Sequence, residues 1–142
     1  MPIAQIHLVR GAFPTDAIGT ALVEASAFYA RTLYPDAEVP PIERVRFFVH
    51  QMDPEMWCAG GRLASEGGTV APFFTCLAMT GRTVAQHHAL LTGITEILAR
   101  HLGCEAAAIR GQVVPVEPDN WGIGGVPASV ARQAEIAARA AG

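Results

Sequence analysis

The second residue of this chain, Pro2, can supply an unusual base. After removal of the initiator methionine, the nitrogen of a second-position proline becomes a free secondary amine that is both basic and nucleophilic. A terminal amine ordinarily has a pKa of about 7.7–8.0, and burial and nearby cations lower the pKa of such a group. In a pocket that contains arginine, Pro2 could therefore act as a general base near neutral pH. The alternative is that Pro2 merely suits methionine aminopeptidase.

Three arginines are candidates for binding an anion. Arg46 and Arg110 lie inside apolar segments that are typical of strands, and Arg82 follows a glycine at an expected strand–helix junction. An arginine within an apolar strand needs a partner, and its planar fork matches a carboxylate. We therefore expect a small anionic substrate, with an internal ion pair to Asp or Glu as the alternative.

Two tryptophans, Trp57 and Trp121, each precede a glycine-rich turn. The pattern favours a hairpin whose aromatic side chain packs on a sheet, and neither turn has the lysine of a phosphate-binding loop. The histidines show no metal-ligand spacing, so no metal site and no cofactor are expected. The three cysteines, Cys58, Cys76 and Cys104, are expected to be free thiols.

The composition indicates one domain that is covered by neighbouring subunits. Hydrophobic residues make up 51% of the 142 residues and charged residues 16%, more apolar surface than a small domain hides alone. The net charge of −3 comes without a basic run, which argues against nucleic-acid binding. No apolar run approaches the roughly 18 residues of a membrane span, and no signal segment is recognised. A cytoplasmic protein is expected.

The chain contains an internal repeat. With an offset of 64 positions, residues 46–65 fall on residues 110–129, so that Arg46 matches Arg110 and Trp57 matches Trp121. With an offset of 70, Pro2 falls on Pro72. The first unit therefore has six extra residues, which we expect near residues 34–41. The units are predicted to span residues 2–66 and 72–142 within a single domain of residues 1–142.

Each unit has the predicted order strand, helix, strand and hairpin. The first strands are expected at 3–9 and 73–79, and the second strands at 45–49 and 109–114. The first helix is expected to begin near Thr15. The second is expected to begin after Thr83, a good N-cap, and to end before Gly103. The alanine-rich tail, 128–141, is expected to be helical.

Two strand–helix–strand units predict an α/β (α+β) fold. The units are expected to form one four-stranded mixed sheet with two helices on one face. The opposite face would then lack a cover, which predicts oligomerisation.

These residues resemble the tautomerase superfamily. Residues 2–7 (Pro-Ile-Ala-Gln-Ile-His) resemble the N-terminus of bacterial 4-oxalocrotonate tautomerase (4-OT), and residues 121–125 (Trp-Gly-Ile-Gly-Gly) with Ala128–Ser129 resemble its C-terminal hairpin. The resemblance covers nearly the whole chain, once per repeat, and is to the fused, tandem members. It implies the tautomerase fold of the macrophage migration inhibitory factor type, an N-terminal proline base, arginines that hold a keto or enol acid, and a homotrimer equivalent to a hexamer of repeats.

The family's residues transfer unevenly to the two repeats. The nitrogen of Pro72 is a tertiary amide within the chain, so that the second pseudo-site is expected to be inactive. The family's arginine after the first-strand glycine is Ala12 in the first repeat and Arg82 in the second. The resemblance therefore implies that Pro2 faces Arg82 and Arg110 of a second repeat. The remaining substrate-binding candidates are Trp121 or Trp57 as the apolar wall, Arg46 and Arg10. The donating chain stays open.

In this reading, the protein is a cofactor-independent keto–enol tautomerase of a small unsaturated 2-hydroxy or 2-keto (di)carboxylate. A first alternative is a hydratase, dehalogenase or decarboxylase of the same superfamily. The water-activating carboxylate of the dehalogenases is replaced by Ala59 and Ile123 here, although Glu117 or Asp119 could substitute. A second alternative is a non-catalytic ligand-binding relative.

Overall fold

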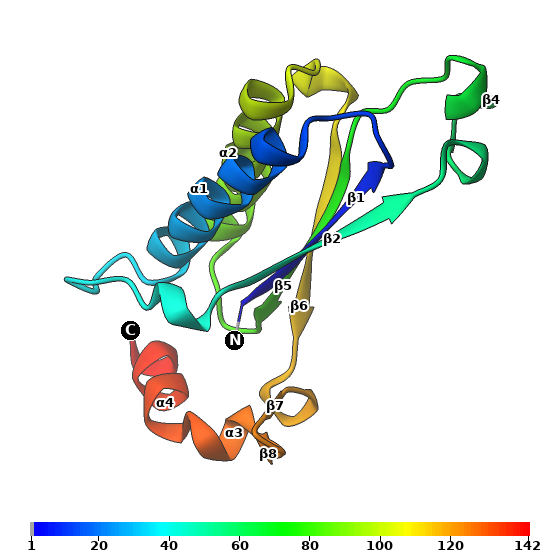
Figure 1. Cartoon of the computed structure of the whole chain (residues 1–142). Helices are drawn as coiled ribbons and strands as arrows, with labels where there is room; N and C mark the ends of the chain where they lie inside the picture. Colours follow the sequence, from blue (N-terminus) through cyan, green and yellow to red (C-terminus); the bar gives the residue numbers. More distant parts are fainter. Residues whose placement is uncertain (1) are drawn as a thin grey trace.

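The computed structural model describes residues 2–142, and its centre is a four-stranded sheet with the order β2-β1-β5-β6 (Figure 1). The strands are β1 (Ile3–Val9), β2 (Arg46–Met52), β5 (Phe73–Met79) and β6 (Arg110–Val116). Strands β1 and β2 are parallel, as are β5 and β6, whereas β1 and β5 are antiparallel. This is the mixed sheet that the sequence predicts.

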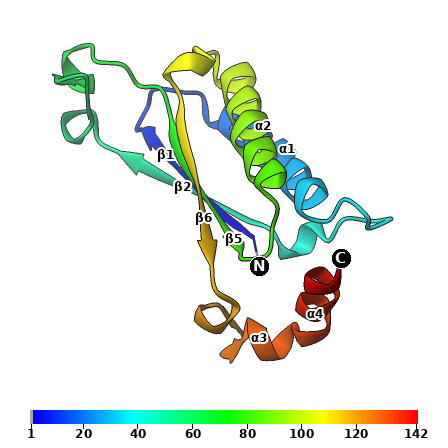
Figure 2. The same cartoon turned by 180° about the vertical axis from the view of Figure 1, so that it is seen from behind.

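The first strand of each repeat has the same alternation of buried and partly exposed residues. In β1 the buried set includes Ala4, Ile6 and Leu8, and in β5 it includes Phe74 and Cys76. These side chains form one cluster with the apolar sides of helices α1 (Thr15–Leu33) and α2 (Val84–Leu102). Both helices cover the same face of the sheet (Figures 1 and 2), as expected from the sequence.

Helix α2 begins and ends at the predicted residues. The hydroxyl of Thr83 accepts a hydrogen bond from the backbone N–H of Gln86 at 3.1 Å, and the Gln86 side chain accepts from the backbone N–H of Thr83 at 3.0 Å. This reciprocal arrangement is a capping box. Gly103 ends the helix at φ 65°, a backbone conformation that favours glycine. Helix α1 begins at Thr15, also as predicted.

The second strands begin later than predicted, and the interior position expected for Arg46 and Arg110 is wrong. Each arginine is the first residue of its strand and is exposed. The backbone N–H of Arg46 donates to the carbonyl of Pro2 at 3.0 Å, and that of Arg110 to Pro72 at 3.2 Å. Short 3-10 turns, Ile42–Arg44 and Ala106–Ala108, precede the two strands. Proline has no backbone N–H once it is within a chain, so a strand ladder ends naturally there.

The six extra residues of the first repeat are divided between two connections. The loop between α1 and the 3-10 turn spans residues 34–41, against 103–105 in the second repeat. Five of the six residues therefore lie where they were expected. The sixth precedes α1, because residues 10–14 correspond to residues 80–83.

Short hairpins follow β2 and β6, and the tail is helical in two parts. The hairpin strands are β3 (Cys58–Ala59), β4 (Arg62–Leu63), β7 (Gly122–Ile123) and β8 (Val126–Pro127). The tail forms α3 (Ala128–Ala131) and α4 (Gln133–Ala141), which are separated at Arg132 by non-helical backbone. In Figure 1, α4 lies near the end of the sheet where the chain starts.

The sheet face opposite the helices is only partly covered. Strand register places three rows of four side chains on it, Arg46–Ile3–Leu77–Val114, Phe48–Gln5–Thr75–Gln112 and His50–His7–Phe73–Arg110, and two end pairs, Met52–Val9 and Met79–Val116. Phe48 is 47% exposed and Met52 is 36% exposed. We call this surface the open face. Its apolar part accounts for the excess of hydrophobic residues in the composition and is suited to contact with another subunit.

Candidate functional site

The antiparallel pairing of β1 with β5 determines which candidate residues meet. Ile3 pairs with Leu77, and β5 continues past it to Met79. The segment from Thr80 to Arg82 therefore leaves the sheet at the end of the strands where Pro2 enters it. The backbone N–H of Thr80 donates to Val116 of β6 at 2.9 Å, so the end of β6 lies there too. We call this end of the sheet the Pro2 end and the opposite end the Pro72 end.

Pro2 and Trp121 both lie at the Pro2 end. Pro2 is buried, and Trp121 is only 8% exposed. The indole packs with Met79 and Ala128, and the partly buried Ile3 joins the same cluster. Trp121 and Ile3, the residue that follows Pro2, thus belong to the same apolar cluster. Hairpin β7–β8 positions it, because the backbone N–H of Ala128 donates to the Trp121 carbonyl at 2.8 Å.

Arg82 lies at the same end, between β5 and α2, and is partly buried. One guanidinium nitrogen donates to the carbonyl of Leu33. The guanidinium carbon is 4.8 Å from the ring centroid of Tyr34, a cation–π contact. The Nε atom is buried without a hydrogen-bond partner among residues 2–142. Burial, and next the charge of Arg139, lower the pKa of Arg82, but an arginine remains charged at neutral pH.

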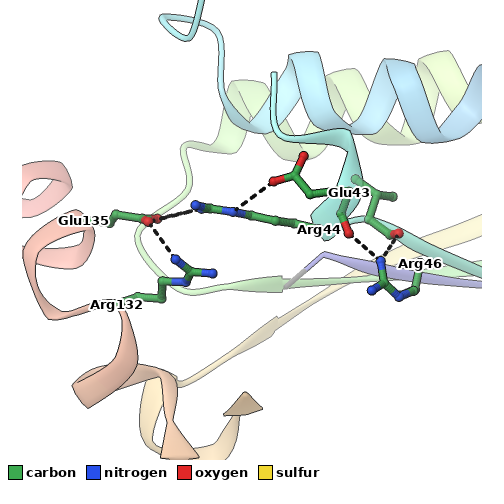
Figure 3. A network of polar contacts seen from close by, with 6 residues as sticks. Glu43, Arg44, Arg46, Arg132 and Glu135 are labelled. Atoms are coloured by element: carbon green, nitrogen blue, oxygen red, sulfur yellow. Dashed lines mark hydrogen bonds and ion pairs between the residues drawn. The ribbon is translucent and has the colours of Figure 1, made fainter. Parts of the chain in front are cut away.

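Arg46 also lies at the Pro2 end, at the start of β2. Its Nη1 donates to the carbonyls of Glu43 at 2.6 Å and Val45 at 2.9 Å (Figure 3). In the part of the chain that the structure describes, Arg46 has no acidic partner. The internal ion pair considered from the sequence is therefore not formed there.

Arg110 lies at the Pro72 end, away from the Pro2 of its own chain. It pairs with Phe73, which pairs with His7. His7 lies four positions after Ile3 in β1, which is roughly 13 Å along a strand. The Arg110 guanidinium repeats the geometry of Arg46, donating to the carbonyls of Ala107 at 2.6 Å and Ile109 at 3.0 Å. Within one chain, Arg110 and Pro2 do not meet.

Arg10 and Trp57 also belong to the Pro72 end. Arg10 donates through Nε to Asp53 at 2.8 Å, and through Nη1 to the Gln51 side chain at 3.2 Å. The indole nitrogen of Trp57 donates to the carbonyl of Thr69 at 3.1 Å. The structure thus brings Pro2, Arg82, Trp121 and Arg46 to one end of the sheet. It places Arg110, Arg10 and Trp57 at the other, beside Pro72.

A pocket of about 980 Å³ adjoins Arg82, and no sequence motif predicts it. Its lining comes from the loop 34–41, the start of α2 and helix α4, and it includes Tyr34, Arg44 and Arg139. Arg44 lies 5.7 Å from the ring centroid of Tyr34, on which Arg82 also stacks. No sequence motif marks Tyr34, Arg44 and Arg139, because they line one pocket only when helix α4 folds back toward the loop 34–41.

Other kinds of site have little support in the described residues. Residues 2–142 contain no group of three His, Cys, Asp or Glu side chains placed to hold a metal ion. All three cysteines are free, and only Cys58 is exposed. None of the helices described is both long and apolar enough to cross a membrane.

Comparison with known proteins gives matches at two levels. The model of the tautomerase enzyme family matches residues 72–131. Among solved structures, native fused 4-OT superposes with a TM-score of 0.79 at 23% identity, over 89% of this chain and 95% of that chain. No curated protein matches the sequence significantly.

Two further solved structures have the same fold. The F6 fused 4-OT wild-type asymmetric trimer gives a TM-score of 0.79 at 21% identity, covering 91% of this chain and 98% of that chain. Pt0534 inactivated by 2-oxo-3-pentynoate gives 0.79 at 19% identity over the same shares. At these identities the likeness establishes the fold and leaves the activity to be argued from the residues.

Proposed function

Because the second repeat of this chain matches the tautomerase family and the whole chain has the fold of fused 4-OT, we propose that the protein is a tautomerase whose base is Pro2. The observation that supports this proposal is the location of Pro2, Arg82 and Trp121 at the same end of the sheet. The substrate is a small unsaturated 2-hydroxy or 2-keto acid. The chemistry needs a base and fixed cations and no organic cofactor.

The base is the nitrogen of Pro2 after removal of Met1. We expect burial of Pro2, and the positive charge of Arg82 at the same end of the sheet, to lower the pKa of that amine. The amine is then unprotonated near neutral pH and accepts the hydroxyl proton of an enol acid. The protonated amine returns one proton to a carbon of the conjugated system, so that the net change is isomerisation.

Arginines hold the substrate and stabilise its charge. Arg82 is suited to the oxygen on which the dienolate charge develops, because its Nε is buried and has no partner in the described chain. A second arginine binds the carboxylate through its fork. We assign that role to Arg110 of a neighbouring subunit, because Arg110 lies at the opposite sheet end from the Pro2 of its own chain. Arg46 of the same chain is the alternative.

Assembly follows from this assignment. The solved fused 4-OT relative is a trimer, and the open face of this chain offers the apolar surface that such an assembly needs. We propose a homotrimer in which each chain contributes one catalytic proline, Pro2, and supplies Arg110 to the site of a neighbouring chain.

The test is a ketonisation assay on phenylenolpyruvate and 2-hydroxymuconate with wild type, Pro2→Ala, Arg82→Ala and Arg110→Ala. We expect Pro2→Ala to lower kcat/KM by about 10²–10⁴ and Arg82→Ala to lower kcat by about 10²–10³. Arg110→Ala should mainly raise KM. Arg62→Ala, on the hairpin at the Pro72 end, is the control and should leave both constants unchanged. Activity indifferent to Pro2 would favour a non-catalytic ligand-binding protein.

One observation favours hydration chemistry as a second candidate. The carboxylate of Glu117 accepts a hydrogen bond from the hydroxyl of Thr80 at 3.2 Å, which places an acid at the Pro2 end. A carboxylate there could activate water for addition to a 3-haloacrylate. Halide release from 3-chloroacrylate that is lost in Glu117→Gln, with ketonisation retained, would support this function. Absence of halide release from wild type would exclude it.

A further inference from the structure

The residue that ends helix α1 is unusual for its position. Tyr34 is the C-cap of α1, and its backbone N–H donates to the carbonyl of Ala30 at 3.0 Å. The corresponding C-cap of α2 is Gly103, whose backbone N–H donates to the carbonyl of Ala99 at 2.9 Å. Glycine is common at the end of a helix because the backbone there often takes a positive φ. Tyr34 has φ −129° instead, so α1 ends without a glycine and presents an aromatic side chain at the Pro2 end.

The two ends of the sheet differ in a pair of neighbouring residues. At the Pro2 end, the guanidinium carbon of Arg82 lies 4.8 Å from the ring centroid of Tyr34. The corresponding residues at the Pro72 end are Gly103, the C-cap of α2, and Ala12, which the internal repeat aligns with Arg82. Arginine and tyrosine thus occur together beside the proline whose nitrogen can become a base, and neither occurs beside the other proline. Since both repeats form the same fold, the fold itself does not require this pair.

Within residues 2–142, Arg82 is held by neutral groups. One guanidinium nitrogen donates to the carbonyl of Leu33, the residue before Tyr34, and the Tyr34 ring makes the cation–π contact. Arg82 forms no ion pair in this part of the chain. An acidic partner would compete with an anionic substrate for the guanidinium. An aromatic ring and a carbonyl instead fix its position and leave its charge available.

Two further contacts fix the ring and the helix end that carries it. The guanidinium carbon of Arg44 is 5.7 Å from the ring centroid of Tyr34, and Arg44 itself donates to Glu135 at 3.0 Å (Figure 3). The side chain of Gln86 donates to the carbonyl of Thr32 at 2.9 Å, which joins the C-terminal end of α1 to the first turn of α2. The ring is therefore held in place beside the start of α2.

We propose that Tyr34 is a positioning residue for Arg82. Its ring and the carbonyl of Leu33 hold the guanidinium and leave Nε, which has no partner among residues 2–142, for the oxygen on which the dienolate charge develops. A cation that is fixed before the reaction needs no reorganisation in the transition state. Tyr34 thus acts on the rate through Arg82 and does not itself bind substrate. The inference rests on the proposed function for the reaction that Arg82 assists.

The kinetic test is a double-mutant cycle between Tyr34 and Arg82, measured as ketonisation of phenylenolpyruvate. Tyr34→Leu removes the ring, so kcat should fall about 3–30-fold, the range expected for a lost cation–π contact. KM should stay within about twofold, because the contact acts in the transition state. Tyr34→Phe keeps the ring and should retain most of kcat. In an Arg82→Ala background, Tyr34→Leu should lower kcat by no more than about twofold, because the two residues act as a unit.

A second readout needs no turnover. It is the Nε–Hε signal of Arg82 in the NMR spectrum of the protein labelled with nitrogen-15, assigned from its loss in Arg82→Lys. An aromatic ring shifts the signals of protons near its face, so the Arg82 signal should move in Tyr34→Leu and stay close to its wild-type position in Tyr34→Phe. The Nε–Hε signal of Arg62, at the Pro72 end, is the control and should not move in either variant.

Three results would overturn the inference. The first is a Tyr34→Leu protein in which kcat or the Arg82 signal is unchanged. The second is an equal loss of kcat in Tyr34→Phe and Tyr34→Leu, and the third is an equal effect of Tyr34→Leu with and without the Arg82 side chain. Any of these beside Pro2-dependent ketonisation would remove the positioning role alone. An Arg82 signal that depends on the Tyr34 ring in a protein without ketonisation would remove the tautomerase assignment and keep the positioning of Arg82.

Discussion

Pro2 and Pro72 occupy equivalent positions in the two repeats but differ in the bonding of the proline nitrogen. Each precedes the first strand of its repeat, and each carbonyl accepts the backbone N–H of an arginine, at 3.0 Å for Pro2 and 3.2 Å for Pro72. The nitrogen of Pro72 is bonded to Ala71 and is not basic, whereas the nitrogen of Pro2 becomes an amine when Met1 is removed. If the proposed function holds, one working site per chain is expected.

His7 should make stability depend on pH. It stacks on His50 with ring centroids 5.0 Å apart, and burial, then the charge of His50, lower the pKa of His7. The neutral form is thus favoured by folding, and this stability is complete above the unfolded pKa of about 6.5. It is lost as pH falls through the lower, folded pKa.

The expected result is a denaturation midpoint that falls between pH 7 and pH 5 by more in wild type than in His7→Phe. Urea unfolding at both values measures the difference, and an NMR titration of the His7 ring measures its pKa directly. A His7 pKa at or above 6.5, or an equal fall of the midpoint in both proteins, would contradict the argument.

At the scale of elements, two helical glycines give a matched pair of substitutions. A Cβ on Gly93 of α2 would lie 2.1 Å from the ring of Phe28 on α1, whereas a Cβ on Gly19 of α1 would meet nothing within 4 Å. Gly93→Ala should destabilise the protein by about 1–3 kcal/mol through overpacking. Gly19→Ala should stabilise it by about 0.5–1 kcal/mol, because alanine is the better helix former. Chemical denaturation checks both, and a stabilised Gly93→Ala variant would show that the helix contact is looser than described.

Elements with local signals could be predicted from the sequence. Thr83 and Gly103 mark the ends of α2 through capping chemistry that depends on neighbouring residues. The alternation in residues 3–9 and 73–79 gives the two central strands. The starts of β2 and β6 were placed one residue early, because those boundaries depend on hydrogen bonds to Pro2 and Pro72.

Fewer of the residues in the candidate site could be predicted from the sequence. The likeness of both repeats to 4-OT gave Pro2, Arg82 and Trp121, which lie at one end of the sheet. The sequence did not say that Arg110 lies at the other end, since this follows from the antiparallel pairing of β1 and β5. Arg44 and Arg139 were missed because α4 is docked by a contact between residues 91 positions apart.

At the scale of the whole molecule, the two-ended sheet predicts that subunits complement one another. The Pro2→Ala protein lacks the base and the Arg110→Ala protein binds substrate weakly, so both should be slow at a substrate concentration far below the KM of Arg110→Ala. Under that condition they should regain activity when unfolded together and refolded as mixed trimers. In a mixed trimer, an Arg110→Ala chain with an intact Pro2 can receive Arg110 from its Pro2→Ala neighbour. The ketonisation rate before and after mixing measures the recovery.

The matched control is a mixture of Pro2→Ala with Arg82→Ala. Pro2 and Arg82 lie at the same end of one chain, so that no mixed trimer contains a complete site, and no recovery is expected. Recovery in the control, or its absence in the first mixture, would reassign the donating chains and would favour Arg46 as the carboxylate ligand.

The most direct measurement of the central claim is intact mass and peptide mapping after treatment with 2-oxo-3-pentynoate, the reagent that inactivates the structural relative Pt0534. Its conjugated triple bond is electrophilic and reacts with an unprotonated amine. We expect a chain without Met1 that carries a single adduct on Pro2, with ketonisation lost in proportion to labelling. A retained Met1, or inactivation by an adduct on the exposed Cys58 with Pro2 unmodified, would contradict the proline-base account.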